Sequence, residues 1–160
     1  MPSRSEDALI SLRQIFLAVE IDSRALAKQT SLNPSQFILL QLLKSKQFMT
    51  PGEIAKNMSL AHATVSTLTE KLRKAGLVKR EVSSKDKRSQ TISLTELGSE
   101  TLFKAPDILQ RRFEKQFENI REEEQEQIVL VLKQLSSILG AGNIDAAPLL
   151  DVGSATSVAQ

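Results

Sequence analysis

The stretch that decides the fold runs from Thr50 to Gly98 and reads TPGEIAKNMSLAHATVSTLTEKLRKAGLVKREVSSKDKRSQTISLTELG. Its first residues have the features of a helix start. Thr50 can accept from the free N–H groups of the first turn, Pro51 suits the first helical position, and Glu53 can complete a capping box. We therefore predict a short helix from Pro51 through Met58.

A second helix is predicted after the turn Ser59–Leu60. Apolar residues recur at the spacing of one helical face over residues 61–75, and Gly76 suits the position just after the helix end. Two short helices joined by a tight turn are typical of a helix-turn-helix, whose second helix can lie in the major groove of DNA. The recurring apolar residues are Ala61, Val65, Leu68 and Leu72.

A basic β-hairpin is predicted directly after the second helix. Residues 77–82 alternate as a strand, residues 91–94 can form its antiparallel return, and the polar segment 83–89 lies between them. From Lys71 to Arg88 there are eight basic residues against two acidic ones, a net charge of +6, while the whole chain carries +2. Such a concentration of positive charge is typical of a surface that binds a polyanion. The cations are Lys71, Arg73, Lys74, Lys79, Arg80, Lys85, Lys87 and Arg88.

These motifs resemble the signature of the MarR family of winged helix-turn-helix transcriptional regulators. The most specific parts are the aspartate-x-arginine of the hairpin and the leucine-threonine-x-x-glycine that follows its return strand. The resemblance extends over roughly residues 5–139. It implies a mainly α fold with a small β-hairpin wing, in which a winged helix-turn-helix lobe (residues 33–98) joins a helical dimerisation region. The matching residues are Thr64-Val65-Ser66, Leu72, Gly76-Leu77-Val78, Arg80, Asp86-Lys87-Arg88 and Leu94-Thr95-Glu96-Leu97-Gly98.

The side of the second helix that faces away from its apolar stripe is the predicted DNA-binding face. Small and hydroxyl-bearing residues there can approach phosphates and base edges closely, and the absence of Arg, Asn and Gln from the first two turns limits bidentate base reading. Lys71 is better suited to phosphate than to a base, because a flexible point charge discriminates little by geometry. The predicted contact residues on this helix are His62, Ala63, Thr64, Ser66, Thr67 and Lys71.

The wing supplies the other predicted DNA contacts. The resemblance places Arg88 in the minor groove, where narrow A·T-rich DNA concentrates negative potential. Asp86 would repel phosphate, so we expect it to orient Arg88 or nearby backbone donors. Lys85 and Lys87 are expected to contact flanking phosphates.

The two ends of the chain are predicted to form the dimerisation region. Residues 5–29 read as one long helix whose apolar surface is wider than one small core needs. Such a helix is either buried from two sides within one subunit or shared with a partner subunit, and the resemblance favours the shared helix. Residues 107–139 are expected to complete the interface, so that 1–143 form a single domain.

Proline 106 is expected to kink the helix that begins after Thr95, because it removes one hydrogen bond and crowds the preceding turn. Glu122–Glu124 are expected in the first turn of the last helix, where carboxylates meet the positive end of the dipole. The tail 144–160 is expected to be disordered, with docking on the dimer or a partner as the alternative. Its ending resembles that of MarR-type regulators of compatible-solute genes.

Composition restricts the function classes further. The chain has no cysteine and one histidine, and it contains no glycine-rich phosphate-binding loop, so we expect no enzyme, metal site or cofactor. The apolar runs are too short to span a membrane, and the N-terminus has no secretory signal, so a cytoplasmic protein is expected.

The resemblance implies a homodimer that binds a pseudo-palindromic site in double-stranded DNA, represses transcription, and is released by a small-molecule effector. The alternative is a helical interaction scaffold that does not bind DNA specifically, but this reading leaves the basic wing without a use.

Overall fold

The computed structural model describes residues 3–82 and 90–144. Within these ranges the chain is mainly helical, with one small antiparallel sheet, as the sequence predicted. The elements are α1 (Arg4–Thr30), α2 (Pro34–Lys46), β1 (Phe48–Met49), α3 (Pro51–Met58), α4 (His62–Lys74), β2 (Val78–Val82), β3 (Gln90–Leu94), α5 (Glu96–Lys104), α6 (Leu109–Phe117) and α7 (Glu122–Ile138).

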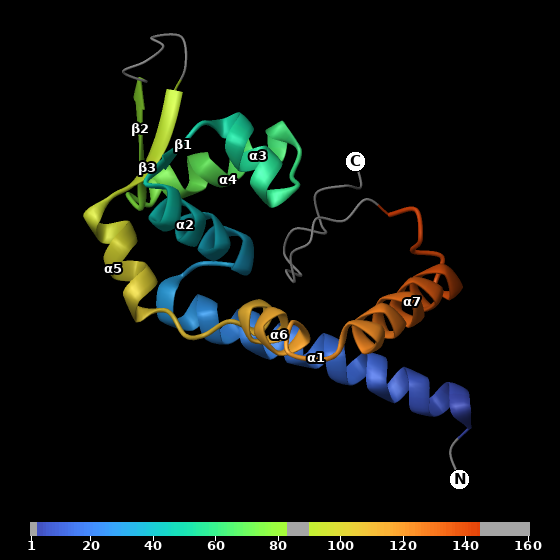
Figure 1. Cartoon of the computed structure of the whole chain (residues 1–160). Coiled ribbons are helices and arrows are strands. Elements are labelled where there is room, and N and C mark those ends of the chain that lie inside the picture. Colours follow the sequence, from blue (N-terminus) through green and yellow to red (C-terminus); the bar gives the residue numbers. More distant parts are fainter. Residues whose placement is uncertain (1–2, 83–89, 145–160) are drawn as a thin grey trace.

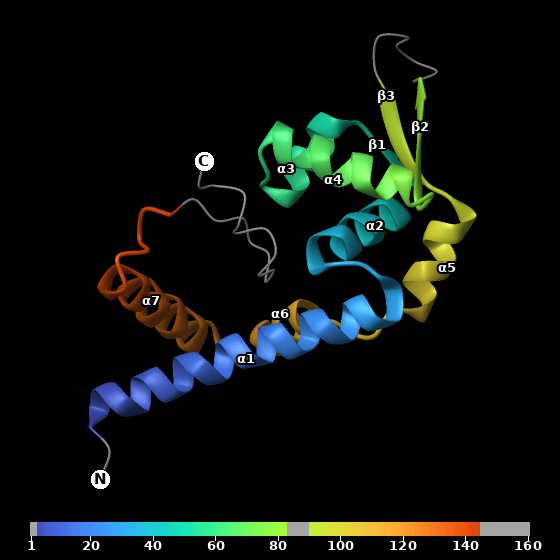
Figure 2. The ribbon, with the colours of Figure 1, turned by 180° about the vertical axis from the view of Figure 1, so that it is seen from behind.

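The elements form two regions that differ in how they are packed (Figures 1 and 2). The first, α2 to β3, is a compact unit, which we call the winged lobe. The second, which we call the helical base, consists of α1 with α6 and α7 beside it, and α5 connects the two regions. Nearly all the buried apolar side chains belong to the winged lobe, whereas α6 and α7 contain no buried residue.

Helices α2 and α3 both begin at capping boxes, of which the one at Thr50 was predicted. Asn33 and Gln36 form a capping box at the start of α2, and Thr50 and Glu53 form another at the start of α3. The backbone N–H of Thr50 donates to the Glu53 carboxylate, and this hydrogen bond lowers the pKa of Glu53. These reciprocal bonds satisfy backbone donors that the first turn of a helix leaves unpaired.

The predicted hairpin is confirmed, and a third strand joins it. Strands β2 and β3 pair antiparallel, with Arg80 opposite Ile92 and Val78 opposite Leu94. The two-residue strand β1 pairs with the other edge of β3, so the sheet order is β1-β3-β2. A segment this short has no detectable alternation, which is why the sequence did not predict it.

A single apolar core holds the winged lobe together. Helix α2 contributes Phe37, Leu39, Leu40 and Leu43, all buried, and therefore lies at the centre of this core. Helices α3 and α4 pack over it, and the sheet closes one side. The orientation of α4 is therefore fixed by burial. The other core members are Leu26, Leu32, Met49, Ile54, Ala55, Met58, Val65, Leu68, Leu72, Leu77, Val78, Ile92 and Ile108.

The junction between the hairpin and α5 is tightly packed. The Thr95 hydroxyl accepts from the Gly98 N–H at 3.0 Å, as predicted for a helix cap, and it also donates to the Gly76 carbonyl at 2.6 Å. A Cβ atom on Gly98 would lie 2.1 Å from the Leu77 carbonyl oxygen. This position therefore has no room for a side chain, and α5 is held directly against the base of β2.

The predicted kink at Pro106 is wrong, because the helix ends there. Helix α5 stops at Lys104, and α6 begins only at Leu109. Ala105 adopts extended backbone angles (φ −71°, ψ 143°), which is the conformation that a following proline favours. Since Pro106 also lacks an N–H, the chain leaves the helix instead of bending it.

Helix α6 is attached to α1 by a side chain far away in the sequence. Asp22 accepts from the Leu109 backbone N–H at 2.7 Å and from Arg112 Nη2 at 2.8 Å. No side chain of its own segment caps α6, so the Asp22 carboxylate serves as the cap from α1. The carboxylate is only 13% exposed, which fixes the start of α6 on the helical base.

The helical base leaves wide apolar surfaces uncovered. On α1 only Val19 and Leu26 are buried, while Phe16 is 64% and Ile21 66% exposed. On α7, Val131 is 60% exposed. Large apolar side chains gathered on two adjacent helices mark a surface for association. Other exposed members are Leu9, Ile10, Ile15, Leu17, Ile128, Val129, Leu130, Leu132, Ile138 and Leu139.

Candidate nucleic-acid interface

Helix α4 has one buried and one exposed face. Val65, Leu68, Thr69 and Leu72 are buried against the lobe. The Thr69 hydroxyl donates to the Val65 and Ser66 carbonyls, at 2.8 and 3.1 Å, so this buried polar group is satisfied within the helix. The opposite face is thereby fixed toward the outside of the winged lobe.

The structure brings the predicted α4 residues together on this outward surface. All six are exposed. The Thr67 hydroxyl donates to the Ala63 carbonyl at 3.1 Å, so its oxygen can still accept a hydrogen bond. Whether these residues contact DNA stays a prediction. The six are His62, Ala63, Thr64, Ser66, Thr67 and Lys71.

The start of α4 has no side-chain cap. Ala61 occupies the cap position and cannot accept a hydrogen bond with its side chain. Ser59, the nearest preceding hydroxyl residue, ends α3 in the left-handed conformation with φ 52°. The first N–H groups of α4 therefore lie at the protein surface without a side-chain acceptor.

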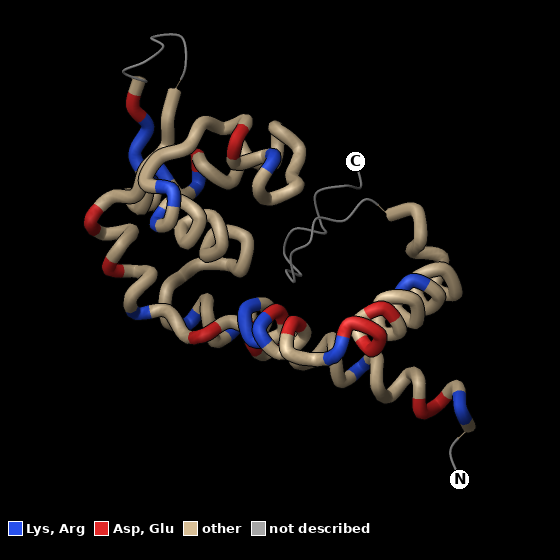
Figure 3. Tube along the Cα trace, viewed as in Figure 1, with Lys and Arg blue, Asp and Glu red and all other residues tan. Residues whose placement is uncertain are grey.

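Cations gather at the C-terminal end of α4 and on the neighbouring strand β2 (Figure 3). In the described part of the chain, Lys71, Lys74 and Arg80 make no ion pair. Lys79 is paired with Glu81 along β2, with 2.8 Å between Nζ and Oε1. The Lys79 ammonium is therefore less available to an outside anion than the other three cations.

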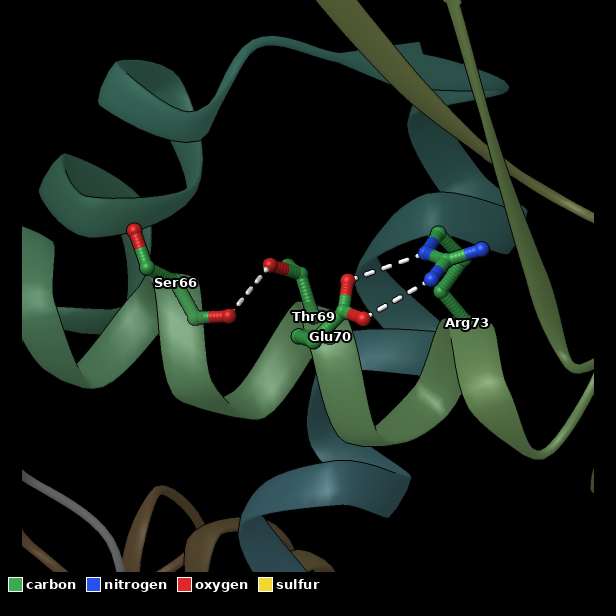
Figure 4. Close-up of polar contacts among 4 residues, drawn as sticks. All are labelled: Ser66, Thr69, Glu70 and Arg73. Carbon is green, nitrogen blue, oxygen red and sulfur yellow. Dashed lines mark hydrogen bonds and ion pairs between the residues drawn. The ribbon is translucent and has the colours of Figure 1, made fainter.

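A second ion pair, on α4 itself, was missed by the sequence reasoning (Figure 4). The Glu70 carboxylate accepts from Arg73 Nε at 2.9 Å and from Arg73 Nη2 at 2.8 Å. The guanidinium of Arg73 lowers the pKa of Glu70, and the charges of Lys74 and Arg80 act in the same direction. The signal was present as opposite charges three residues apart on one helix, but counting charge from Lys71 onward excluded Glu70.

The predicted wing contacts Lys85, Asp86, Lys87 and Arg88 lie outside the described residues. The strands on either side of them are described, and β2 and β3 carry the chain outward past α4 (Figure 1).

A crevice of about 1000 Å³ lies between the winged lobe and the helical base. Helix α2 forms one wall, and the segment from Leu102 to Glu118 forms the other. Its charged residues are balanced, three cationic and three acidic. They are Lys44, Arg111, Lys115, Asp107, Glu114 and Glu118.

The described residues offer neither a metal site nor a membrane-spanning helix. Within 3–82 and 90–144, no group of three or more His, Cys, Asp and Glu side chains could hold a metal ion. No helix in these ranges is both long and apolar enough to cross a membrane.

Comparison with known proteins gives consistent matches. The family model described as MarR family matches residues 32–90. The HTH-type transcriptional regulator YkoM of Bacillus subtilis is 31% identical over 119 residues, which cover 74% of this chain and 77% of that protein. The HTH-type transcriptional repressor MdtR of Bacillus subtilis is 26% identical over 92 residues, 58% of this chain and 59% of that protein.

Among solved structures, the fold is similar to that of Sco3205 from Streptomyces coelicolor, a MarR family transcriptional regulator in complex with DNA. The TM-score is 0.60 at 22% identity, covering 85% of this chain and 88% of that one.

Proposed function

Because this chain belongs to the MarR family of transcriptional regulators, we propose that it is a repressor that binds a pseudo-palindromic operator as a homodimer. The family assignment supports DNA binding and transcriptional regulation. The operator, the dimer, the repression and the effector are our proposals, and each is supported by a separate feature of the molecule.

The observation that carries the proposal is the outward face of α4. Burial on the opposite side leaves Thr64 and Thr67 exposed near the start of the helix. Lys71 and Lys74 follow further along and make no ion pair with the residues that the structure describes. Helix-turn-helix proteins place the first residues of this helix against base edges and let cations contact the backbone. Small hydroxyl side chains followed by lysines fit that division.

The wing would extend the interface into the minor groove. Arg88 is the residue that the family signature places there, with Lys85 and Lys87 on flanking phosphates and Asp86 orienting the turn. Strands β2 and β3 project beside α4, so a contact from the hairpin would fall next to the groove that α4 occupies.

The uncovered apolar faces of α1 and α7 support the homodimer. A second copy would bury these faces around a two-fold axis, and the symmetry would present two α4 helices to successive major grooves about one helical turn apart. The scaffold alternative uses the same faces but gives no role to the cations around α4.

The crevice between the lobe and the base supports an effector site. Binding there would release DNA only if the ligand favours a different spacing of the two winged lobes of the dimer. The chain leaves the helix between Lys104 and Leu109, at the wall of this crevice, so the segment that would have to move is the one without helical hydrogen bonds.

Replacing Arg88 with alanine is expected to weaken operator binding by about tenfold or more, because each dimer would lose two minor-groove contacts. The operator is first isolated by sequencing the genomic fragments that the protein retains. Fluorescence anisotropy over a salt series then gives the affinity and its salt dependence, and light scattering reports the oligomeric state.

Arg4→Ala is the matched control, because it removes the same charge from an exposed position at the start of α1. Unchanged operator affinity in Arg88→Ala would refute the wing assignment. A wild-type protein with no salt-dependent affinity for any duplex would refute the DNA-binding proposal and favour the scaffold.

A further inference from the structure

We propose that Arg73 is a further phosphate-binding residue and that Glu70 is its intramolecular competitor, a carboxylate that occupies the guanidinium until DNA replaces it. This inference rests on the proposed function, since it requires that the outward face of α4 meets DNA.

The geometry of the pair is that of a phosphate complex. Two oxygens of Glu70 accept from two nitrogens of Arg73, at 2.9 and 2.8 Å, in a parallel fork (Figure 4). The same fork of the guanidinium binds two phosphate oxygens, because carboxylate and phosphate present oxygen pairs at similar separation. The carboxylate therefore occupies the donors that a DNA backbone would use.

The position of Glu70 on α4 favours competition with phosphate for Arg73 over a contact with a base. Residues 63, 67, 70 and 74 follow one another at helical spacing on the side opposite the buried stripe. Glu70 lies in the second half of α4, whereas base edges are read from the first half of such helices. A carboxylate there faces phosphates and repels them.

The surrounding charges agree with this assignment. The charges of Lys74 and Arg80 reach Glu70, as does that of Arg73. Glu70 is thus a single negative charge within a cationic cluster whose other members would all favour a polyanion. Removing this charge strengthens the field of the cluster and also frees one guanidinium.

The pair can exchange partners without a change in the fold. The side chains of Arg73 and Glu70 are 49% and 40% exposed, and exposed pairs of this kind contribute little to stability. Both side chains lie outside the buried stripe of α4, so their rotation disturbs no core contact. The consequence is a protein with weaker affinity for all duplexes than its cationic residues would otherwise give, and thus with faster release from non-operator DNA.

The test is a double-mutant cycle of Glu70→Gln and Arg73→Gln in the full chain, measured by anisotropy on operator and scrambled duplexes over a salt series. Glu70→Gln is expected to tighten binding to both duplexes by about threefold to tenfold. Arg73→Gln is expected to weaken binding more in the Glu70→Gln background than in wild type, and to flatten the salt slope there by about 0.9 per subunit.

Glu100→Gln is the control for net charge, since Glu100 is exposed on α5 and makes no ion pair in the described residues. It is expected to change affinity by less than about twofold. Thermal unfolding checks that the variants are folded, and Glu70→Ala serves as a second variant if glutamine disturbs the helix.

Three outcomes would overturn the inference. If Glu70→Gln binds DNA no more tightly than wild type, the Glu70–Arg73 pair is only a contact within the helix and does not compete with DNA. Loss of affinity for the operator alone would mean that the carboxylate reads a base. A wild-type protein that binds no duplex would overturn the proposed function with it, whereas the first two results would leave DNA binding standing.

Discussion

Replacing Phe16 with glutamate is expected to convert the protein from a dimer to a monomer. Phe16 lies on α1 and is 64% exposed in the single chain, on the surface that we assign to the partner subunit. An isologous interface contains each residue twice, so the substitution would bury two carboxylates among apolar side chains. Their desolvation, together with the loss of two large apolar side chains, is expected to raise the dimer dissociation constant by more than about a hundredfold.

Light scattering after size-exclusion chromatography measures the change, and operator affinity is measured in parallel. Phe48→Glu is the matched control, because Phe48 is also exposed, at 60%, but lies on β1 in the winged lobe. It is expected to leave the dimer intact. A Phe16→Glu protein that remains dimeric would show that the apolar face of α1 is not the interface.

Replacing Gly98 with alanine is expected to destabilise the fold by about 2–3 kcal/mol, in the range of overpacked cores. The added Cβ would lie 2.1 Å from the Leu77 carbonyl oxygen, which belongs to the backbone and cannot rotate away. Relief requires α5 to move from β2, and this would break the bonds that Thr95 makes to Gly76 and Gly98. The expected fall in Tm is about 5–10 °C, measured by circular dichroism.

Gly52→Ala provides the comparison for this substitution. Gly52 also lies in the first turn of a helix, but a Cβ there would meet only His62 Cε1, at 3.8 Å. Alanine favours a helix over glycine, so this variant is expected to be as stable as wild type or slightly more so. A similar loss in both variants would show that close packing at Gly98 is not the cause.

Local signals in the sequence were sufficient for most of the winged lobe. The helices predicted to begin at Thr50 and Thr95 do begin there, because a side chain that satisfies the first turn is encoded within four residues of it. The apolar periodicity of α4 fixed its buried face for the same reason. Features that depend on distant segments were not readable: β1 exists only through its pairing with β3, and α6 is capped by Asp22 from α1.

The exposed face of α4 was predictable in outline, but the ion pairs beside it were not. Burial of Val65 and Leu72 places the predicted contacts outward, yet composition alone cannot tell a free arginine from a paired one. Arg73 is held by Glu70, and Lys79 by Glu81, so a count of cations overestimates the local field. The break at Pro106 was missed because a proline can either bend or end a helix, and the packing of Ile108 into the core favours the ending.

Helix α7 contributes no side chain to a core within the single chain. None of its seventeen residues is buried in the single chain, so the helix gains little by folding until another surface covers it. In the proposed homodimer, folding and assembly would form one equilibrium, and the melting temperature is expected to rise with protein concentration. Dilution would then dissociate the helical bases that hold the two winged lobes at a fixed separation. In a cell, the level of expression would therefore set the amount of dimer that can bind DNA.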